Sequence, residues 1–390
     1  MCYRAGMNEM EDQKVDPHPR PLPVTGEGGA LSRTMNVVRR GMEEGVHIGG
    51  QVFVSVKGEP VLDWAVGEAR PGVAMGTATL MVWMSSTKPI AAVAIAQLWE
   101  KGLLELDDLV TKFIPEFGQN GKQNITIRHL LTHTAGIRGL IGKWEEQSWD
   151  QIIAMISAMR VEPGWEVGKK AGYHTLTSWY VLGEIVRRAD GRAFEKYVRE
   201  EIFLPIGMTD SWVGLPGDAH RAYGDRIGLM HDTFHGEPRV LSTENEEGAA
   251  RVRPGANGRG PIRELGKFYE MLLKNGLAGG KQILLPQTVE AMTARHRVGL
   301  YDQTFKHLID WGLGIIVNSH YHGETVPYGF GPHASLRAFG HSGHQSSTGF
   351  ADPEYGLAVA WVMNGMPGEK RHDLRVREIN SAIYEDLDLA

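Results

Sequence analysis

The chain has 390 residues, of which 42% are hydrophobic and 23% charged, enough for a large core in one large domain or two smaller ones. Its formal net charge is -6 and no block of Lys and Arg stands out, which argues against a nucleic-acid partner. A single cysteine, Cys2, excludes an intrachain disulfide. With no apolar secretory segment and no membrane-length apolar run, the sequence predicts a cytoplasmic protein.

The N-terminal region differs from the rest of the chain. Residues 1–32 contain the proline-rich run Asp16–Pro23 and a following cluster of glycines, a composition that cannot bury enough surface to order itself. We expect a disordered extension there, followed by a helix over 33–46. The alternating segment 51–56, a Lys-Gly-Glu-Pro turn and the segment 61–66 predict a β-hairpin.

The next element carries the first chemical motif. Ser85 and Lys88 form an S-x-x-K pattern, and Pro89 opens an apolar run that continues to Gly102. Proline is tolerated only in the first turn of a helix, so the helix should start close to Ser85. A hydroxyl, an ammonium and the positive end of a helix then meet at one point, which favours an activated nucleophile. A helix cap with a solvated lysine is the alternative that this tetrapeptide alone leaves open.

The remaining elements predict an α+β fold. Helical spacing covers 127–131, 149–156, 176–189, 261–273, 286–297 and 371–386, whereas 311–317, 347–351 and 357–364 have strand character. Strands therefore occur at both ends of the chain. We expect an antiparallel sheet built from the N- and C-terminal segments, flanked by helices, within a domain over 33–390 that carries a mostly helical insertion at about 103–250.

Tyr173 is the candidate acid/base partner of the serine. It precedes the amphipathic helix 176–189, and a phenol is a poor base at its free pKa of about 10. A neighbouring Lys88 ammonium would favour the phenolate and lower that pKa. The alternative is a half-buried tyrosine whose hydroxyl binds backbone.

The third motif is Gly340-His-Ser-Gly-His344, a small-residue strand that allows a substrate carbonyl to approach backbone N–H groups and so to form an oxyanion hole. It resembles the G-x-S-x-G elbow of α/β-hydrolases, but its fifth residue is His344 and Ser342 lacks the strand-turn-helix context. The histidines of this segment and the pair His320 and His322 lack the spacing and the carboxylate of a zinc site, so no metal is expected.

The three motifs in this order resemble the serine β-lactamase-like and penicillin-binding-protein superfamily, in its class C-like branch, and within it most closely the family VIII carboxylesterases. That superfamily uses S-x-x-K, then Y-x-N, then K-T-G or variants. Here they read Ser85-x-x-Lys88, Tyr173-His-Thr175 and His341-Ser-Gly343. The resemblance covers about residues 33 to 388 and implies a β-lactamase/transpeptidase-like fold without a cofactor.

The resemblance also implies residue roles. Ser85 would be acylated, Lys88 would orient its hydroxyl, and Tyr173 would take the Ser85 proton and deliver it to the leaving alkoxide. The N–H groups of Ser85 and His344 would hold the oxyanion. Ser342 would hydrogen-bond substrate. Three aromatic residues of the helical region are candidates for an acyl pocket, with ordinary core packing an equal alternative: Trp144, Trp149 and Trp165.

Two residues differ from the superfamily's motifs, and these differences narrow the range of predicted substrates. Thr175 stands where the superfamily has asparagine, and His341 stands where it has lysine, positions that help hold the substrate carboxylate and amide in β-lactamases and peptidases. A mostly neutral histidine weakens anion recognition, which a neutral ester does not need. We therefore predict a serine hydrolase of short- to medium-chain carboxylic esters, with weak β-lactamase activity compatible with the same site. A β-lactamase, a D,D-peptidase or an acyltransferase remains the alternative, and a small-molecule ester is the expected partner.

Overall fold

The computed structural model describes residues 31–139, 144–323 and 325–390. Most of the predicted N-terminal extension therefore lies outside the described residues. Its predicted boundary is slightly late, since Ser32 already begins α1 (Ser32–Glu43). In the described part of the chain, no helix combines the length and the apolar character needed to cross a membrane.

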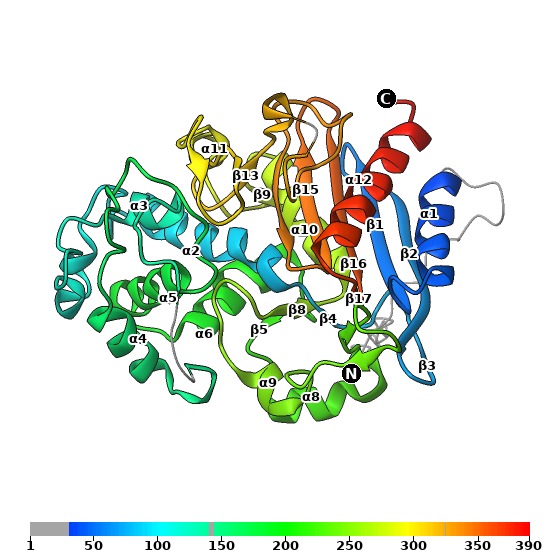
Figure 1. Ribbon diagram of the computed structural model, residues 1–390, viewed down its shortest axis with the longest axis horizontal. Helices are drawn as coiled ribbons and strands as arrows, with labels where there is room; N and C mark the ends of the chain where they lie inside the picture. The colour runs from blue at the N-terminus through cyan, green and yellow to red at the C-terminus, as the bar shows by residue number, and fades with distance from the viewer. Residues whose placement is uncertain (1–30, 140–143, 324) are drawn as a thin grey trace, which may run out of the picture.

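A seven-stranded antiparallel sheet in the order β13-β14-β15-β16-β1-β2-β3 forms the centre of the fold (Figure 1). Val52 of β1 lies opposite Trp361 of β16, so the N-terminal hairpin and the C-terminal strands close one sheet, as predicted. The strands are β1 (Gly49–Val56), β2 (Glu59–Arg70), β3 (Val73–Ala74), β13 (Ile316–Val317), β14 (Phe339–Gly343), β15 (Ser347–Asp352) and β16 (Leu357–Met363).

Helices cover both faces of this sheet. Alternate residues of a strand point to opposite faces, so Val52 and Trp361 belong to the core beneath α1 and α12 (Glu369–Asp386), and Phe53 belongs to the larger core on the other face. Figure 1 shows α1 and α12 side by side on the outer face, with α10 (Ile262–Leu273) behind the sheet.

The chain between β4 (Met81–Val82) and α10 consists of helices separated by loops and short strands. It contains α2 (Lys88–Glu100), α3 (Ile127–Leu131), α4 (Trp149–Ala158), α5 (Thr177–Asp190), α6 (Phe194–Val198), α7 (Leu204–Ile206), α8 (Gly217–Tyr223) and α9 (Glu246–Ala250), and α11 (Pro286–Thr293) follows α10. The short strands are β4 (Met81–Val82), β5 (Trp212–Val213), β6 (His231–Asp232), β7 (Arg239–Val240), β8 (Gly258–Gly260), β9 (Leu277–Ala278), β10 (Lys281–Gln282), β11 (Tyr301–Asp302), β12 (His307–Leu308) and β17 (Gly365–Met366). In Figure 1 helices α3 to α6 form a lobe beside the sheet, and α2 runs between the lobe and the sheet.

Two local predictions need correction. The strand expected over 311–317 is only the two-residue β13, because Gly314 has a φ of 74° that breaks an extended run. A Cβ at Gly314 would lie 2.6 Å from the Ala92 side chain of α2, so close packing requires glycine there. The helix expected to start near Ser85 begins at Lys88, and Ser85 lies in a preceding 3₁₀ turn, Met84–Thr87.

Candidate active site

The S-x-x-K motif lies on a strained turn at the N-terminal end of a buried helix. Met84 has a φ of 48°, in the left-handed region that non-glycine residues seldom adopt, and Ser85 follows it directly. Residues i and i+3 eclipse each other in a 3₁₀ turn, so the Lys88 side chain lies over Ser85. Lys88 Nζ donates a 2.9 Å hydrogen bond to Ser85 Oγ. The predicted nucleophile and its basic partner are therefore in direct contact.

Lys88 is buried without a compensating negative charge. Its side chain has 0% exposure, and its second hydrogen bond, of 2.8 Å, goes to the carbonyl oxygen of Gly255. No carboxylate among the described residues forms an ion pair with it. Burial therefore lowers the pKa of Lys88 well below the ordinary 10.5, because the charged form has lost its hydration. The neutral amine, which accepts a proton, is favoured next to the serine.

Tyr173 faces the same two groups. Lys88 Nζ lies 5.0 Å from the centroid of the Tyr173 ring, and the phenol hydrogen-bonds Ser85. Burial raises the pKa of Tyr173 above its ordinary 10.0, more than the Ser85 hydrogen bond lowers it. The expectation that Lys88 lowers this pKa is wrong, because the loss of hydration on burial dominates and the Asp302 charge raises the pKa further. The phenol is therefore a proton donor or relay in the resting site.

A buried ion pair that the sequence analysis missed holds Tyr173 in place. The Tyr173 N–H donates to Asp302 Oδ1 at 3.1 Å, and Asp302 is paired with the equally buried Arg297 at 3.1 Å. Thr304 Oγ1 donates to the Tyr173 carbonyl oxygen at 3.1 Å. These residues follow α11, about 130 positions after Tyr173, with no motif that marks them. Only the folded chain shows their positioning role.

The third motif forms β14, which is hydrogen-bonded to the 3₁₀ turn that carries Ser85. Ser86 Oγ donates to the His341 carbonyl oxygen at 3.0 Å. A Cβ at Gly343 would lie 2.3 Å from the Trp83 carbonyl oxygen, so only glycine lets the end of β14 approach the turn this closely. Ser342 lies within this strand and contacts Thr348 Oγ1 at 3.1 Å, which is not the strand-turn-helix geometry of a hydrolase elbow.

His341 supplies no positive charge to the site. Its side chain is 2% exposed, and Nδ1 lies 2.7 Å from the Ser342 carbonyl oxygen. Burial, and secondarily the nearby Lys88, lower the pKa of His341 to about 3, so the imidazole is neutral at physiological pH. This agrees with the interpretation that the third motif has lost the fixed charge of a lysine.

These groups line a pocket of about 430 Å³, called the Ser85 pocket below. Six of its lining residues were predicted, namely Ser85, Tyr173, Thr175, His341, Ser342 and His344, and seven were not, namely Thr304, Phe305, Ile316, Pro327, Tyr328, Glu369 and Asp373. The described lining includes no Lys or Arg side chain, and Lys88 lies behind Ser85. The described residues contain no group of three potential metal ligands.

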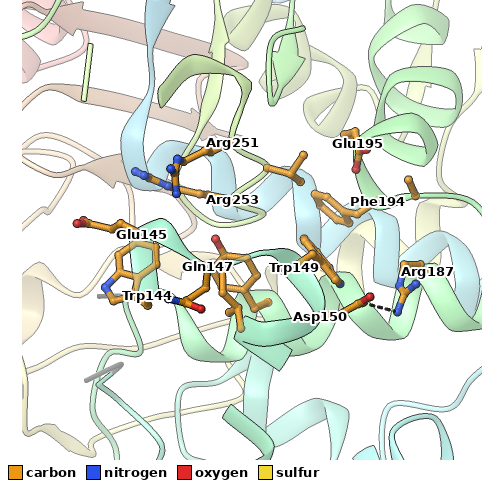
Figure 2. A pocket seen from close by; sticks show the side chains of 14 residues that line it. Trp144, Glu145, Gln147, Trp149, Asp150, Arg187, Phe194, Glu195, Arg251 and Arg253 are labelled. Atoms are coloured by element: carbon orange, nitrogen blue, oxygen red, sulfur yellow. Dashed lines mark hydrogen bonds and ion pairs between the residues drawn. The ribbon is translucent and has the colours of Figure 1, made fainter. Parts of the chain in front are cut away.

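The predicted acyl-pocket tryptophans do not line the Ser85 pocket. Trp144 and Trp149 line a second pocket of about 430 Å³ between α4, α5, α6 and the segment 251–253 (Figure 2), called the tryptophan pocket below. Trp165 instead covers Gly136 and donates a 3.0 Å hydrogen bond to the Thr134 carbonyl oxygen. Their positions in the sequence place these three tryptophans in the inserted region but do not show which cavity each ring lines.

The geometry agrees with comparisons to known proteins. A family model described as Beta-lactamase matches residues 35–383. The chain belongs to the beta-lactamase family. This member is 28% identical to the Esterase/beta-lactamase LipL of Mycobacterium tuberculosis over 346 residues, which are 81% of this chain and 77% of that protein.

Solved structures show the same fold. A family VIII carboxylesterase matches with a TM-score of 0.77 and 28% identity, covering 92% of this chain and 97% of that one. A penicillin-binding protein homolog from Caulobacter crescentus matches with a TM-score of 0.74 and 29% identity, covering 90% and 97%. The predicted family and the α+β class are thus confirmed, and this member is a hydrolase of the beta-lactamase family whose relatives include both esterases and penicillin-binding proteins.

Proposed function

We propose that this hydrolase cleaves short- to medium-chain carboxylic esters through an acyl-enzyme on Ser85. The observation that carries the proposal is the charge of the Ser85 pocket. Glu369 and Asp373 line it, no described Lys or Arg does, and burial keeps His341 neutral. β-Lactams and D-alanyl peptides present a carboxylate, which such a lining repels, whereas an uncharged ester meets no such penalty. Esterase relatives support the same choice.

The proposed reaction uses the contacts of the resting site. Ser85 Oγ attacks the ester carbonyl carbon while its proton passes to Lys88 Nζ, 2.9 Å away. The N–H groups of Ser85 and His344 stabilise the oxyanion. Tyr173 donates its proton to the departing alkoxide and recovers one from the Lys88 ammonium. Water then attacks the acyl-enzyme, gives its proton to the same pair, and releases the carboxylic acid with Ser85 restored.

A substrate comparison tests this proposal. Initial rates are measured on p-nitrophenyl acetate, p-nitrophenyl butyrate and a chromogenic cephalosporin with wild type and Ser85→Ala. We expect both esters to be hydrolysed at least tenfold faster than the cephalosporin, and ester turnover to disappear in Ser85→Ala. Ser342→Ala is the matched control, because this serine lies in the same pocket and should retain far more activity than Ser85→Ala. Faster cephalosporin turnover, or an active Ser85→Ala enzyme, would contradict the proposal.

A further inference from the structure

Two carboxylates of α12 border the Ser85 pocket, one helical turn apart. Glu369 and Asp373 occupy positions i and i+4 at the start of this helix, where like charges repel each other. Neither was identified from the sequence, because nothing in the local pattern shows that the first turns of α12 border a cleft. Two carboxylates beside a reactive serine suggest a role in substrate selection, because each of them lowers the affinity of the pocket for anions.

The two carboxylates differ in their partners. Glu369 is engaged by three neighbours: the Tyr328 hydroxyl at 2.7 Å, Gln345 Nε2 at 3.1 Å and His344 Nδ1 at 3.2 Å. Asp373 Oδ1, by contrast, is buried and has no hydrogen-bond partner among the described residues. Buried polar atoms in native proteins are nearly always paired, and Asp373 lines both the Ser85 pocket and a neighbouring pocket, so its unpaired oxygen indicates a missing donor beside one of them.

The surroundings of Asp373 show what that donor should be. Burial, and then the charge of Glu369, raise the pKa of Asp373 to about 6, so its carboxylate is ionised at pH 8 but poorly compensated. Asp373 also lines a neighbouring pocket of about 570 Å³, and there the cations Lys370 and Arg377 line it too, with the Arg377 charge lowering the pKa of Asp373, whereas no described Lys or Arg lines the Ser85 pocket. A cation is therefore favoured on the Ser85 side of Asp373 and disfavoured beyond it.

We propose that Asp373 forms a subsite for a cationic group of the substrate, so that the preferred substrates are small esters that carry an ammonium close to the scissile bond. This inference rests on the proposed ester hydrolysis at Ser85. Tyr328 also lines the Ser85 pocket and presents an aromatic ring beside the two carboxylates, which suits a quaternary or primary ammonium. Asp373 acts in this account as a specificity-determining residue that takes no part in proton transfer.

The test uses pairs of esters that share a shape and differ only in charge. Acetylcholine is compared with 3,3-dimethylbutyl acetate, and the p-nitrophenyl ester of γ-butyrobetaine with that of 5,5-dimethylhexanoic acid, which places the cation on either side of the ester. We expect kcat/KM for the cationic member of at least one pair to exceed that of the neutral member about tenfold or more at pH 8. In Asp373→Asn this ratio should fall towards one.

The matched control is Glu378→Gln, which removes a carboxylate of the same helix. Glu378 pairs with Arg40 at 2.9 Å and does not line the pocket, so this variant should leave the ratio unchanged. Equal rates within both pairs, or a preference that survives in Asp373→Asn, would overturn the inference. Binding of the same pairs to Ser85→Ala, measured by calorimetry, gives a readout that needs no turnover. If the neutral esters are turned over without a cation preference, the cation subsite is overturned and the proposed ester hydrolysis stands. If Ser85→Ala binds cationic esters selectively but the wild type hydrolyses none of them, only the proposed hydrolysis is overturned.

Discussion

The Ser85 pocket and the tryptophan pocket have the same volume, about 430 Å³, but opposite charge chemistry. In the tryptophan pocket Arg187 pairs with Asp150 at 3.3 Å, Arg251 pairs with Glu247, and Arg253 stacks on the Trp144 ring at 5.3 Å. In the Ser85 pocket the lysine behind the nucleophile has no counter-ion. Size and aromatic lining therefore do not distinguish a reactive site, whereas a buried lysine without a counter-ion beside a hydroxyl does.

The largest expected effect comes from replacing Lys88. Lys88→Met should lower kcat on p-nitrophenyl butyrate by on the order of 10³- to 10⁴-fold, because Ser85 loses its proton acceptor. Thermal stability should hold or rise. Burial lowers the pKa of Lys88, so between that lowered pKa and the ordinary 10.5 the unfolded state binds a proton that the folded state lacks. This disfavours folding, and methionine removes that cost, which offsets the lost hydrogen bond to the Gly255 carbonyl oxygen.

A second buried lysine provides the control for this comparison. Lys122 is also fully buried, and its Nζ donates to the carbonyl oxygens of Gln119 and Ser157 at 2.9 Å and 3.0 Å. Lys122→Met should destabilise the fold, because backbone acceptors lose their donor, yet leave kcat of the folded enzyme within about twofold. An active Lys88→Met enzyme, or an inactive but folded Lys122→Met enzyme, would break the distinction between the two sites.

One tyrosine in each pocket provides the comparison with the next largest expected effect on kcat. Tyr173→Phe should lower kcat by on the order of 10²- to 10³-fold, since the leaving alkoxide loses its proton donor while Lys88 still accepts the serine proton. Tyr180, a tyrosine of the tryptophan pocket that is 2% exposed, provides the matched change, and Tyr180→Phe should stay within about twofold of wild type. Steady-state kinetics at saturating ester measure both, and equal losses would show that Tyr173 acts only through packing.

The pH dependence of ester hydrolysis follows from the burial of Lys88 and Tyr173. Activity needs the neutral Lys88 amine, whose pKa burial lowers, so kcat/KM for a neutral ester should rise with pH and reach a plateau well below pH 10. Burial raises the pKa of Tyr173, so no decline is expected up to about pH 9. Asp373→Asn should keep the profile, which excludes the carboxylate with a pKa of about 6 as its origin. A bell-shaped profile centred near neutrality would show that a different acid/base pair acts.

The smallest expected effect concerns the tryptophans. Trp149→Phe should change kcat/KM less than about twofold, because its ring lies outside the Ser85 pocket. It should nevertheless lower the free energy of unfolding by roughly 1–2 kcal/mol, since Trp149 Nε1 donates to the buried Glu184 carboxylate at 2.8 Å. Chemical denaturation and ester kinetics are compared on the same preparation. A tenfold loss of kcat/KM without loss of stability would place this tryptophan in the substrate site.

The predictable part of this molecule is the part encoded by local patterns. Proline at position 89 and the three-residue spacing from Ser85 to Lys88 locate the nucleophile, and the alternation of 51–56 with the strand character of 357–364 predicts the sheet. Side chains that meet only through packing were missed. Asp302 and Arg297 hold Tyr173 from 129 and 124 positions away, and Asp373 reaches the pocket because α12 crosses the sheet. Burial also reversed the predicted direction of the Tyr173 pKa, which depends on solvent access.

Covalent trapping tests directly whether Ser85 is the activated nucleophile of this pocket. An ethyl p-nitrophenyl alkylphosphonate, which is an uncharged diester, transfers its phosphonyl group to an activated serine and releases p-nitrophenolate. We expect one equivalent of p-nitrophenolate, loss of ester turnover, and one phosphonyl group on the peptide that contains Ser85 in wild type but none in Ser85→Ala. A label on Ser342 or on any other side chain, or full ester turnover after complete labelling of Ser85, would contradict the account.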